Sequence, residues 1–144
     1  MPGEIVKEYV LIDSNDRTDE AASTDKFTVH LFKPLKDVIK TDLVMFNFMG
    51  ANGDPLEDVP FFVIQSRELG TPIRTASNTF GYWRLVPGPA TTTALYATSF
   101  NTRVDPYLDT SRTIQDIDIT LLNPDGTSPV LGRVTILVEI ERRS

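Results

Sequence analysis

The stretch VTILVEIE, residues 134–141, indicates the fold class of this chain because its apolar and polar residues alternate. Every even-numbered residue in it is valine or isoleucine, whereas the odd-numbered residues include Thr135, Glu139 and Glu141. Successive side chains of a β-strand point to opposite faces, so a strand with one buried face has this period of two. Residues 134–141 are therefore predicted to form a half-buried strand.

The same alternation recurs along the chain and predicts further strands. Ile117, Ile119 and Leu121, for example, alternate with polar residues. Pro34 is expected to end an earlier strand, because proline cannot donate a backbone hydrogen bond to a sheet. The eight predicted strands cover residues 5–12, 27–31, 38–49, 61–65, 79–86, 95–102, 116–121 and 134–140.

Two of these segments carry additional information about strand pairing. Residues 123–129, NPDGTSP, connect the last two predicted strands, and proline and glycine in this arrangement are typical of a turn. We therefore predict that these two strands pair with each other through a short connection. Residues 43–46 are consecutively apolar, which is typical of a strand with both faces covered and predicts a central or interface strand.

Short strands, connections rich in proline and glycine, and the lack of a convincing helical stripe are typical of a two-sheet β-sandwich. Eight strands are what a jelly roll needs. An immunoglobulin-type sandwich is disfavoured, because its Cys…Trp…Cys signature cannot occur in a chain without cysteine. We predict an all-β fold, a single eight-stranded antiparallel jelly-roll sandwich, in which residues 1–144 form one domain.

The composition restricts the classes of function. The 14 basic and 20 acidic residues give a net charge of −6, which disfavours binding to a phosphate backbone, so no nucleic-acid partner is expected. The absence of cysteine excludes disulfides and thiolate metal sites. No stretch approaches the ~20 apolar residues of a membrane span and no signal peptide is evident, so we expect no direct membrane insertion and synthesis in a cytoplasm.

Few residues are suited to catalysis. His30 is the only histidine, and its strand position places it opposite the apolar face, without a second histidine at metal-ligand spacing. A solvated or interface role is therefore expected for His30. A Ser-His-Asp triad stays open on residue types alone, but the sequence has no Gly-x-Ser-x-Gly motif, and we predict no enzyme activity and no cofactor.

Asp13, Ser14, Asn15 and Asp16 resemble the start of a calcium-binding loop. Arg17 occupies the position where a third oxygen ligand would be needed, and no glycine follows at the required place. The segment is predicted to be a polar turn in which Asx side chains accept hydrogen bonds from nearby backbone N–H groups. A calcium site completed by other loops is the alternative.

Phe80, Tyr82 and Trp83 form an aromatic cluster that would be suited to stacking on sugars or bases if it were exposed. Strand alternation places Phe80, Tyr82 and Arg84 on one face and Trp83 and Leu85 on the other, so both faces carry a bulky group. Core packing is the preferred interpretation, because large aromatic side chains dominate core burial.

Three segments near the N-terminus form a longer signature: YVLIDSNDRT at residues 9–18, FTVHL at 27–31 and PLKDV at 34–38. IDITLLNPDG at 117–126 and the strand at 134–140 follow near the C-terminus. In this order the segments resemble the single jelly-roll penton-like and minor capsid proteins of large DNA viruses and related tailless icosahedral viruses. That family has a turn after its first strand and a closing hairpin.

The resemblance implies a structural virion protein in the capsid shell, and in particular the penton subunit, which forms pentamers at the icosahedral vertices beside the major capsid protein. The residues that match the family's signature turn are Asp13, Ser14, Asp16 and Arg17. A closed ring uses a heterologous interface, in which one flank of each subunit meets the opposite flank of the next.

Such a ring needs apolar flanks and a solvated surface. Asp54, Glu57 and Asp58 are the candidates for the solvent-facing surface. The candidates for the subunit interface are Leu43, Val44, Met45 and Phe46.

Three alternatives accompany this hypothesis. The first is another minor capsid protein. The second is a carbohydrate-binding β-sandwich, which Tyr82 and Trp83 suggest. The third is an enzyme of the cupin type, which is disfavoured because cupins hold a metal with several histidines and this chain has one.

Overall fold

The computed structural model describes residues 3–50, 60–76, 81–87, 94–97, 105–129 and 131–144. Within these ranges the chain is all-β and contains no α-helix, as predicted. The elements are β1 (Ile5–Asp13), the 3-10 helix η1 (Ser14–Asp16), β2 (Lys26–Gly50), β3 (Phe61–Gln65), β4 (Arg84–Pro87), β5 (Ala94–Ala97), β6 (Tyr107–Leu122) and β7 (Leu131–Arg143).

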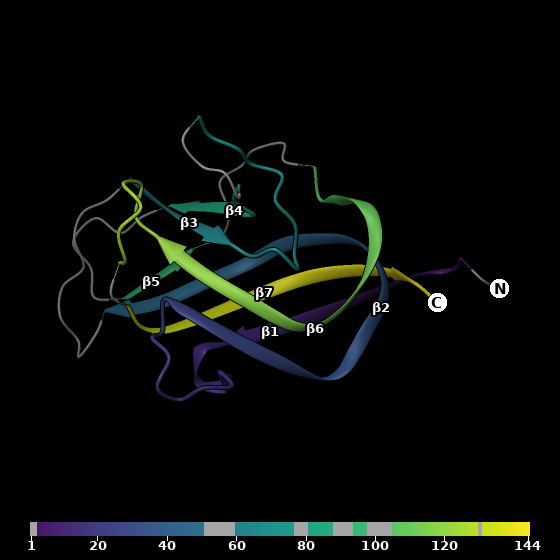
Figure 1. Ribbon diagram of the computed structural model, residues 1–144, viewed down its shortest axis with the longest axis horizontal. Coiled ribbons are helices and arrows are strands. Elements are labelled where there is room, and N and C mark those ends of the chain that lie inside the picture. Colours follow the sequence, from purple (N-terminus) through teal and green to yellow (C-terminus); the bar gives the residue numbers. More distant parts are fainter. Residues whose placement is uncertain (1–2, 51–59, 77–80, 88–93, 98–104, 130) are drawn as a thin grey trace.

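The strands form one antiparallel sheet that curls on itself (Figure 1). Six of them follow the order β1-β7-β2-β6-β3-β4, and β5 pairs with the end of β2. The long strand β2 is the axis of the curl. Residues 26–40 of β2 pair with β6, and residues 38–50 pair with β7 on the opposite edge.

Two predicted strand boundaries, the end of 27–31 and the start of 38–49, are absent from the structure. Residues 27–31 and 38–49 were predicted as separate strands with Pro34 between them, but they form one continuous strand of 25 residues. Pro34 lies where the pairing with β6 shifts register, between His30 and Leu35, so its missing N–H leaves no ladder position empty. Asp37, at φ 53°, accompanies a second shift. The described strands therefore number seven, whereas eight were predicted.

The closing hairpin was also predicted wrongly. Strands β6 and β7 do not pair with each other; they flank β2 on its two edges. The turn chemistry was predicted correctly, since Gly126 has φ 87° and donates to the carbonyl of Asn123 at 2.9 Å. The connection fails to make a hairpin because β6 ends near Lys26 and β7 begins near Gly50, the opposite ends of β2.

The remaining predicted strands correspond to observed ones with altered ends. β1 and β3 match their predictions closely, and β6 and β7 extend beyond theirs. Parts of the predicted strands at 79–86 and 95–102 lie outside the described residues, and the described parts contain β4 and β5.

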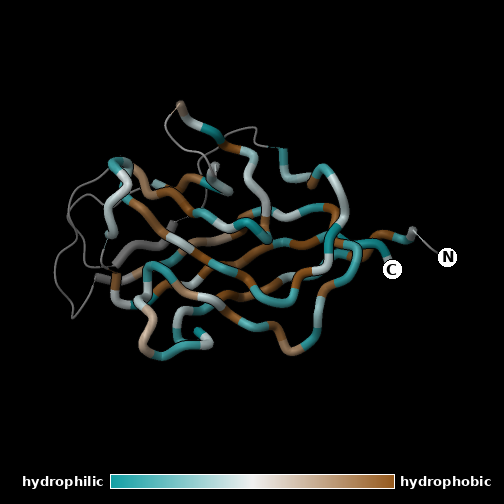
Figure 2. The backbone as a smooth tube through the Cα atoms, in the orientation of Figure 1, coloured by the Kyte–Doolittle hydropathy of each residue, from teal (hydrophilic) through white to brown (hydrophobic). Residues whose placement is uncertain are grey.

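One core forms between the facing halves of the curled sheet. Brown and teal alternate along the strands in Figure 2, which is the period of two read in the sequence. Phe48 of β2 meets Phe62 of β3 across the core, with ring centroids 5.1 Å apart and an edge-to-face angle of 80°. Each fully buried apolar side chain of this kind contributes about 1.5–3 kcal/mol. The largest are Trp83, Phe46, Phe48, Phe62, Ile12, Ile64, Leu69, Ile114, Ile117, Ile119, Leu121 and Ile136.

Candidate functional site

The signature turn is a compact, hydrogen-bonded unit. Asp13 caps η1, and its Oδ1 accepts from the backbone N–H of Asn15 at 3.0 Å, which confirms the predicted Asx turn. Arg17 donates to three backbone carbonyls, those of Ser14 (2.7 Å), Glu20 (3.0 Å) and Ala22 (3.0 Å). The guanidinium of Arg17 therefore fixes the whole loop from residue 14 to residue 22.

The same turn is joined to β7. Arg133 donates to both carboxylate oxygens of Asp13, at 3.2 and 2.6 Å, and the buried Ser14 accepts from the N–H of Val134 at 3.1 Å. The hydrogen bond from Arg133 holds the pKa of Asp13 below its usual value, against the opposing effect of burial. Asp13 thus serves as a structural carboxylate between two strands.

The candidate interface at residues 43–46 is a β-bulge. The pairing with β7 runs from Leu43 opposite Val138 to Met45 opposite Leu137, so Val44 is an extra residue. Leu43 and Phe46 are buried and Val44 is 37% exposed. The buried side chains therefore change from odd-numbered to even-numbered positions at the bulge, which explains the consecutive apolar run. The prediction that both faces are covered is wrong at Val44. Any contact of this segment with another chain involves Val44 and Met45, since Leu43 and Phe46 pack inside the protein.

An apolar surface surrounds this bulge on the outside of the sheet formed by β1, β7 and β2. Leu11, Leu137 and Met45 lie in one row across the three strands. Tyr9 and Leu11 of β1 are 57% and 56% exposed. Large exposed hydrophobic groups that lie together are typical of an interaction site. We call this surface the outer apolar face; its residues are Tyr9, Leu11, Val44, Met45 and Leu137.

Charged residues border the outer apolar face. Lys40 lies 3.1 Å from Glu139 and 3.6 Å from Glu141, and Lys7 lies 3.8 Å from Glu139. Burial alone would lower the pKa of Lys40, but the hydrogen bond from Lys40 to Glu139 and the two carboxylate charges raise it above the ordinary value. The border is thus a mixed network of charges that keeps both signs paired.

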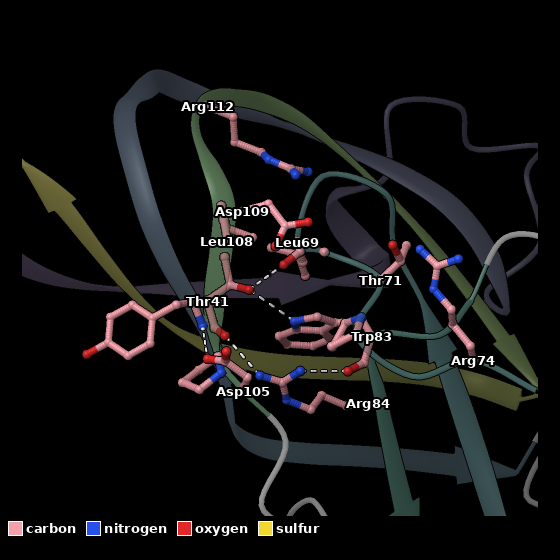
Figure 3. A pocket seen from close by; sticks show the side chains of 14 residues that line it. Thr41, Leu69, Thr71, Arg74, Trp83, Arg84, Asp105, Leu108, Asp109 and Arg112 are labelled. Carbon is pink, nitrogen blue, oxygen red and sulfur yellow. Dashed lines mark hydrogen bonds between the residues drawn. The ribbon is translucent and has the colours of Figure 1, made fainter.

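A second polar centre lies beside β4, in a hollow of about 110 Å³ (Figure 3). The indole of Trp83 donates to Thr41 Oγ1 at 3.1 Å, and Thr41 donates to the carbonyl of Leu69. Arg84 is buried and donates to the carbonyls of Trp83 (2.6 Å) and Thr41 (3.0 Å) and to Asp42 (3.1 Å). Burial lowers the pKa of Arg84, while Asp42 opposes the shift. This network ties β4 to β2 and is structural.

The burial of Trp83 bears on the aromatic cluster of the sequence. Trp83 is fully buried, which confirms core packing for this residue. A buried indole cannot stack on a sugar. Phe80 lies outside the described residues, and so do Asp54, Glu57 and Asp58 of the predicted solvent-facing surface.

His30 lies on the exposed face of β2, as expected from the strand pattern. Its Nδ1 lies 2.6 Å from Asp116 of β6, and its Nε2 lies 3.4 Å from Gln115. In the part of the chain that the structure describes, no three His, Cys, Asp or Glu side chains are grouped so that they could hold a metal ion.

The sequence interpretation missed the outer face of β1. The signal was present, because odd-numbered and even-numbered positions of residues 5–12 both carry apolar side chains, as in the segment 43–46.

No helix in the described ranges is long and apolar enough to cross a membrane. No known family model and no curated protein matches the chain.

Proposed function

We propose that this chain is a structural subunit of an icosahedral virion shell, built as a single jelly roll. Strand β2 counts as two strands if it is divided at its bend, which gives eight. We count these eight strands along the chain. One layer contains β1, β7, the second half of β2 and β5, which are the first, eighth, third and sixth strands. The other layer contains the first half of β2, β6, β3 and β4, which are the second, seventh, fourth and fifth strands. This is the order of a jelly roll, and it supports the proposed fold.

The single observation that carries self-association is the outer apolar face. It holds three of the six large hydrophobic residues that are exposed among the described residues, and two of the four candidate interface residues belong to it. Exposed apolar groups concentrated on one surface of the protein favour a protein that is covered by neighbours in its working state. The resemblance of the signature segments implies that those neighbours are further copies in a penton and the major capsid protein.

Sedimentation velocity of the purified chain tests the proposal. We expect a homo-pentamer with five times the 16.1 kDa mass of one chain, and we expect Val44→Lys to weaken it by placing a charge on the outer apolar face. Phe32→Lys is the matched control, because Phe32 is 95% exposed and lies outside that face. A chain that stays monomeric at every concentration and is absent from purified particles would contradict the proposal.

A further inference from the structure

Strand β1 is an edge of the sheet that the described strands form. It pairs with β7 over nine consecutive residue pairs without a register shift, and no other described strand pairs with it. Natural edge strands are usually short, bulged, or interrupted by proline and several charges. Between Ile5 and Asp13 there is no proline and no bulge, and the only charged residues before Asp13 are Lys7 and Glu8. A straight, largely apolar edge of this kind is suited to pairing with another strand.

The backbone groups on the open side belong to identifiable residues. Ser144 donates to the carbonyl of Glu4 at 2.8 Å, so the backbone of Glu4 faces β7. Backbone direction alternates along an antiparallel strand, and the even-numbered residues of β1 therefore face β7 as well. The odd-numbered residues Ile5, Lys7, Tyr9 and Leu11 turn their N–H and C=O groups to the open side, and their side chains lie on the outer face of the sheet.

We propose that β1 pairs antiparallel with β1 of a second copy of this chain, about a twofold axis at Glu8. In this register Ile5 lies opposite Leu11 of the partner subunit, and Lys7 lies opposite Tyr9 of the partner subunit. The first pair is aliphatic and the second places a cation beside an aromatic ring, so the strand is complementary to itself. This contact is isologous, unlike the heterologous contacts of a ring, and it goes beyond the proposed function by joining two subunits without closing a ring.

The side chains favour this register over those with an axis at Lys7 or Tyr9. An axis at Lys7 would oppose two lysines, and an axis at Tyr9 would oppose Lys7 to Leu11 and Ile5 to Asp13. The axis at Glu8 brings two carboxylates together, but Arg142 binds each of them within its own subunit, with Nη2 2.9 Å and Nε 3.1 Å from Oε1. Each Glu8 therefore enters the contact as half of an ion pair, which reduces the repulsion between the two.

The absence of cysteine from the chain permits a direct test. In the proposed register Glu8 faces its own copy at a non-hydrogen-bonded position, where Cα atoms lie about 4.5 Å apart, within the range that a disulfide spans. Glu8→Cys, Val10→Cys and the exposed β6 control Thr113→Cys are each equilibrated in a glutathione redox buffer. The disulfide-linked dimer is then quantified by non-reducing electrophoresis, and the fluorescence of the buried Trp83 verifies folding.

We expect Glu8→Cys to form disulfide-linked dimer with an equilibrium constant about 100-fold larger than that of Thr113→Cys. We expect Leu11→Lys in the Glu8→Cys background to remove that advantage. Equal dimer formation by Glu8→Cys and Thr113→Cys would overturn the contact, and a larger yield from Val10→Cys would overturn the register. If the chain is a pentamer and Glu8→Cys forms no more disulfide-linked dimer than Thr113→Cys, the β1 contact is overturned and the proposed penton is not. If the chain is a dimer and Glu8→Cys forms more disulfide-linked dimer than Thr113→Cys, the proposed penton is overturned and the β1 contact is kept.

Discussion

Arg133 binds Asp13 through two hydrogen bonds although 120 positions separate them in the sequence. The pair joins the end of β1 to the start of β7, at the point where the signature turn begins. Because Ser14 also accepts from the backbone of Val134, the turn is attached to β7 by a side chain and by a backbone group. This attachment holds the end of β1 in place beside the outer apolar face.

The ion pair predicts a pH-dependent stability. The pKa of Asp13 is lower in the folded state than its ordinary value of 3.8, because Arg133 hydrogen-bonds the carboxylate. Its contribution to stability is therefore present above about pH 4 and is lost as the pH falls through the folded-state pKa. We expect Arg133→Met to lower the urea midpoint at pH 7, and the difference from the wild type to shrink toward pH 2. Arg143→Met, on the exposed end of β7, is the control. A difference that stays constant down to pH 2 would contradict the role of this pair.

The hydroxyl of Thr41 predicts the cost of losing the contact between β2 and β4. Thr41→Val keeps the shape but leaves the buried indole N–H of Trp83 and the carbonyl of Leu69 without this partner. We expect the free energy of unfolding to fall by about 1–3 kcal/mol, measured by urea denaturation with Trp83 fluorescence. Thr113→Val, on the exposed face of β6, should change it by less than about 0.5 kcal/mol. Equal effects of the two substitutions would show that the hydrogen bonds of Thr41 contribute nothing.

The bulge at Val44 predicts an unusual tolerance of deletion within a central strand. Without Val44, the buried Leu43, the outward Met45 and the buried Phe46 would alternate regularly, and the pairing with β7 would be continuous. We therefore expect the deletion variant to fold, as measured by circular dichroism and thermal unfolding. Deletion of Asn47 would shift Phe48 to the outer face and should prevent folding. If both deletions unfold the protein, the assignment of Val44 as the extra residue is wrong.

The register of β6 predicts opposite effects at adjacent positions. Ile119 is fully buried, so Ile119→Asp should lower the free energy of unfolding by about 4 kcal/mol or more, because it buries a charge without a partner. Asp118 is exposed and accepts from the Thr28 hydroxyl at 2.5 Å, so Asp118→Ala should cost less than about 1 kcal/mol. Similar urea midpoints for the two variants would contradict this register.

The alternation of residue types was sufficient to predict the strands, because one-sided burial leaves a period of two in the sequence. It did not predict where β2 bends, since Pro34 is typical of a strand end and equally fits a register shift inside a strand. It also misassigned the partners of β6 and β7. Strand pairing depends on long-range packing. β6 and β7 follow each other in the sequence, but they lie on opposite edges of β2.

The candidate site was predicted only in part for a similar reason. Four consecutive apolar residues have the same pattern in a doubly buried strand and in a one-residue bulge, so the exposure of Val44 was not visible in the sequence. The hydrogen bond of Asp13 with Asn15 is local and was predicted from residue type. The bonds of Asp13 with Arg133 join distant segments, and no local pattern encodes them.

A three-dimensional electron-microscopy map of the virion in which we propose that this chain is a subunit tests the central claim most directly, because the position of a copy identifies its role. We predict density that fits the curled sheet of β1 to β7 in the shell, with five copies around each vertex and the outer apolar face covered by neighbouring chains. A shell whose density is fully accounted for by other chains would contradict the proposal that this protein is a capsid subunit.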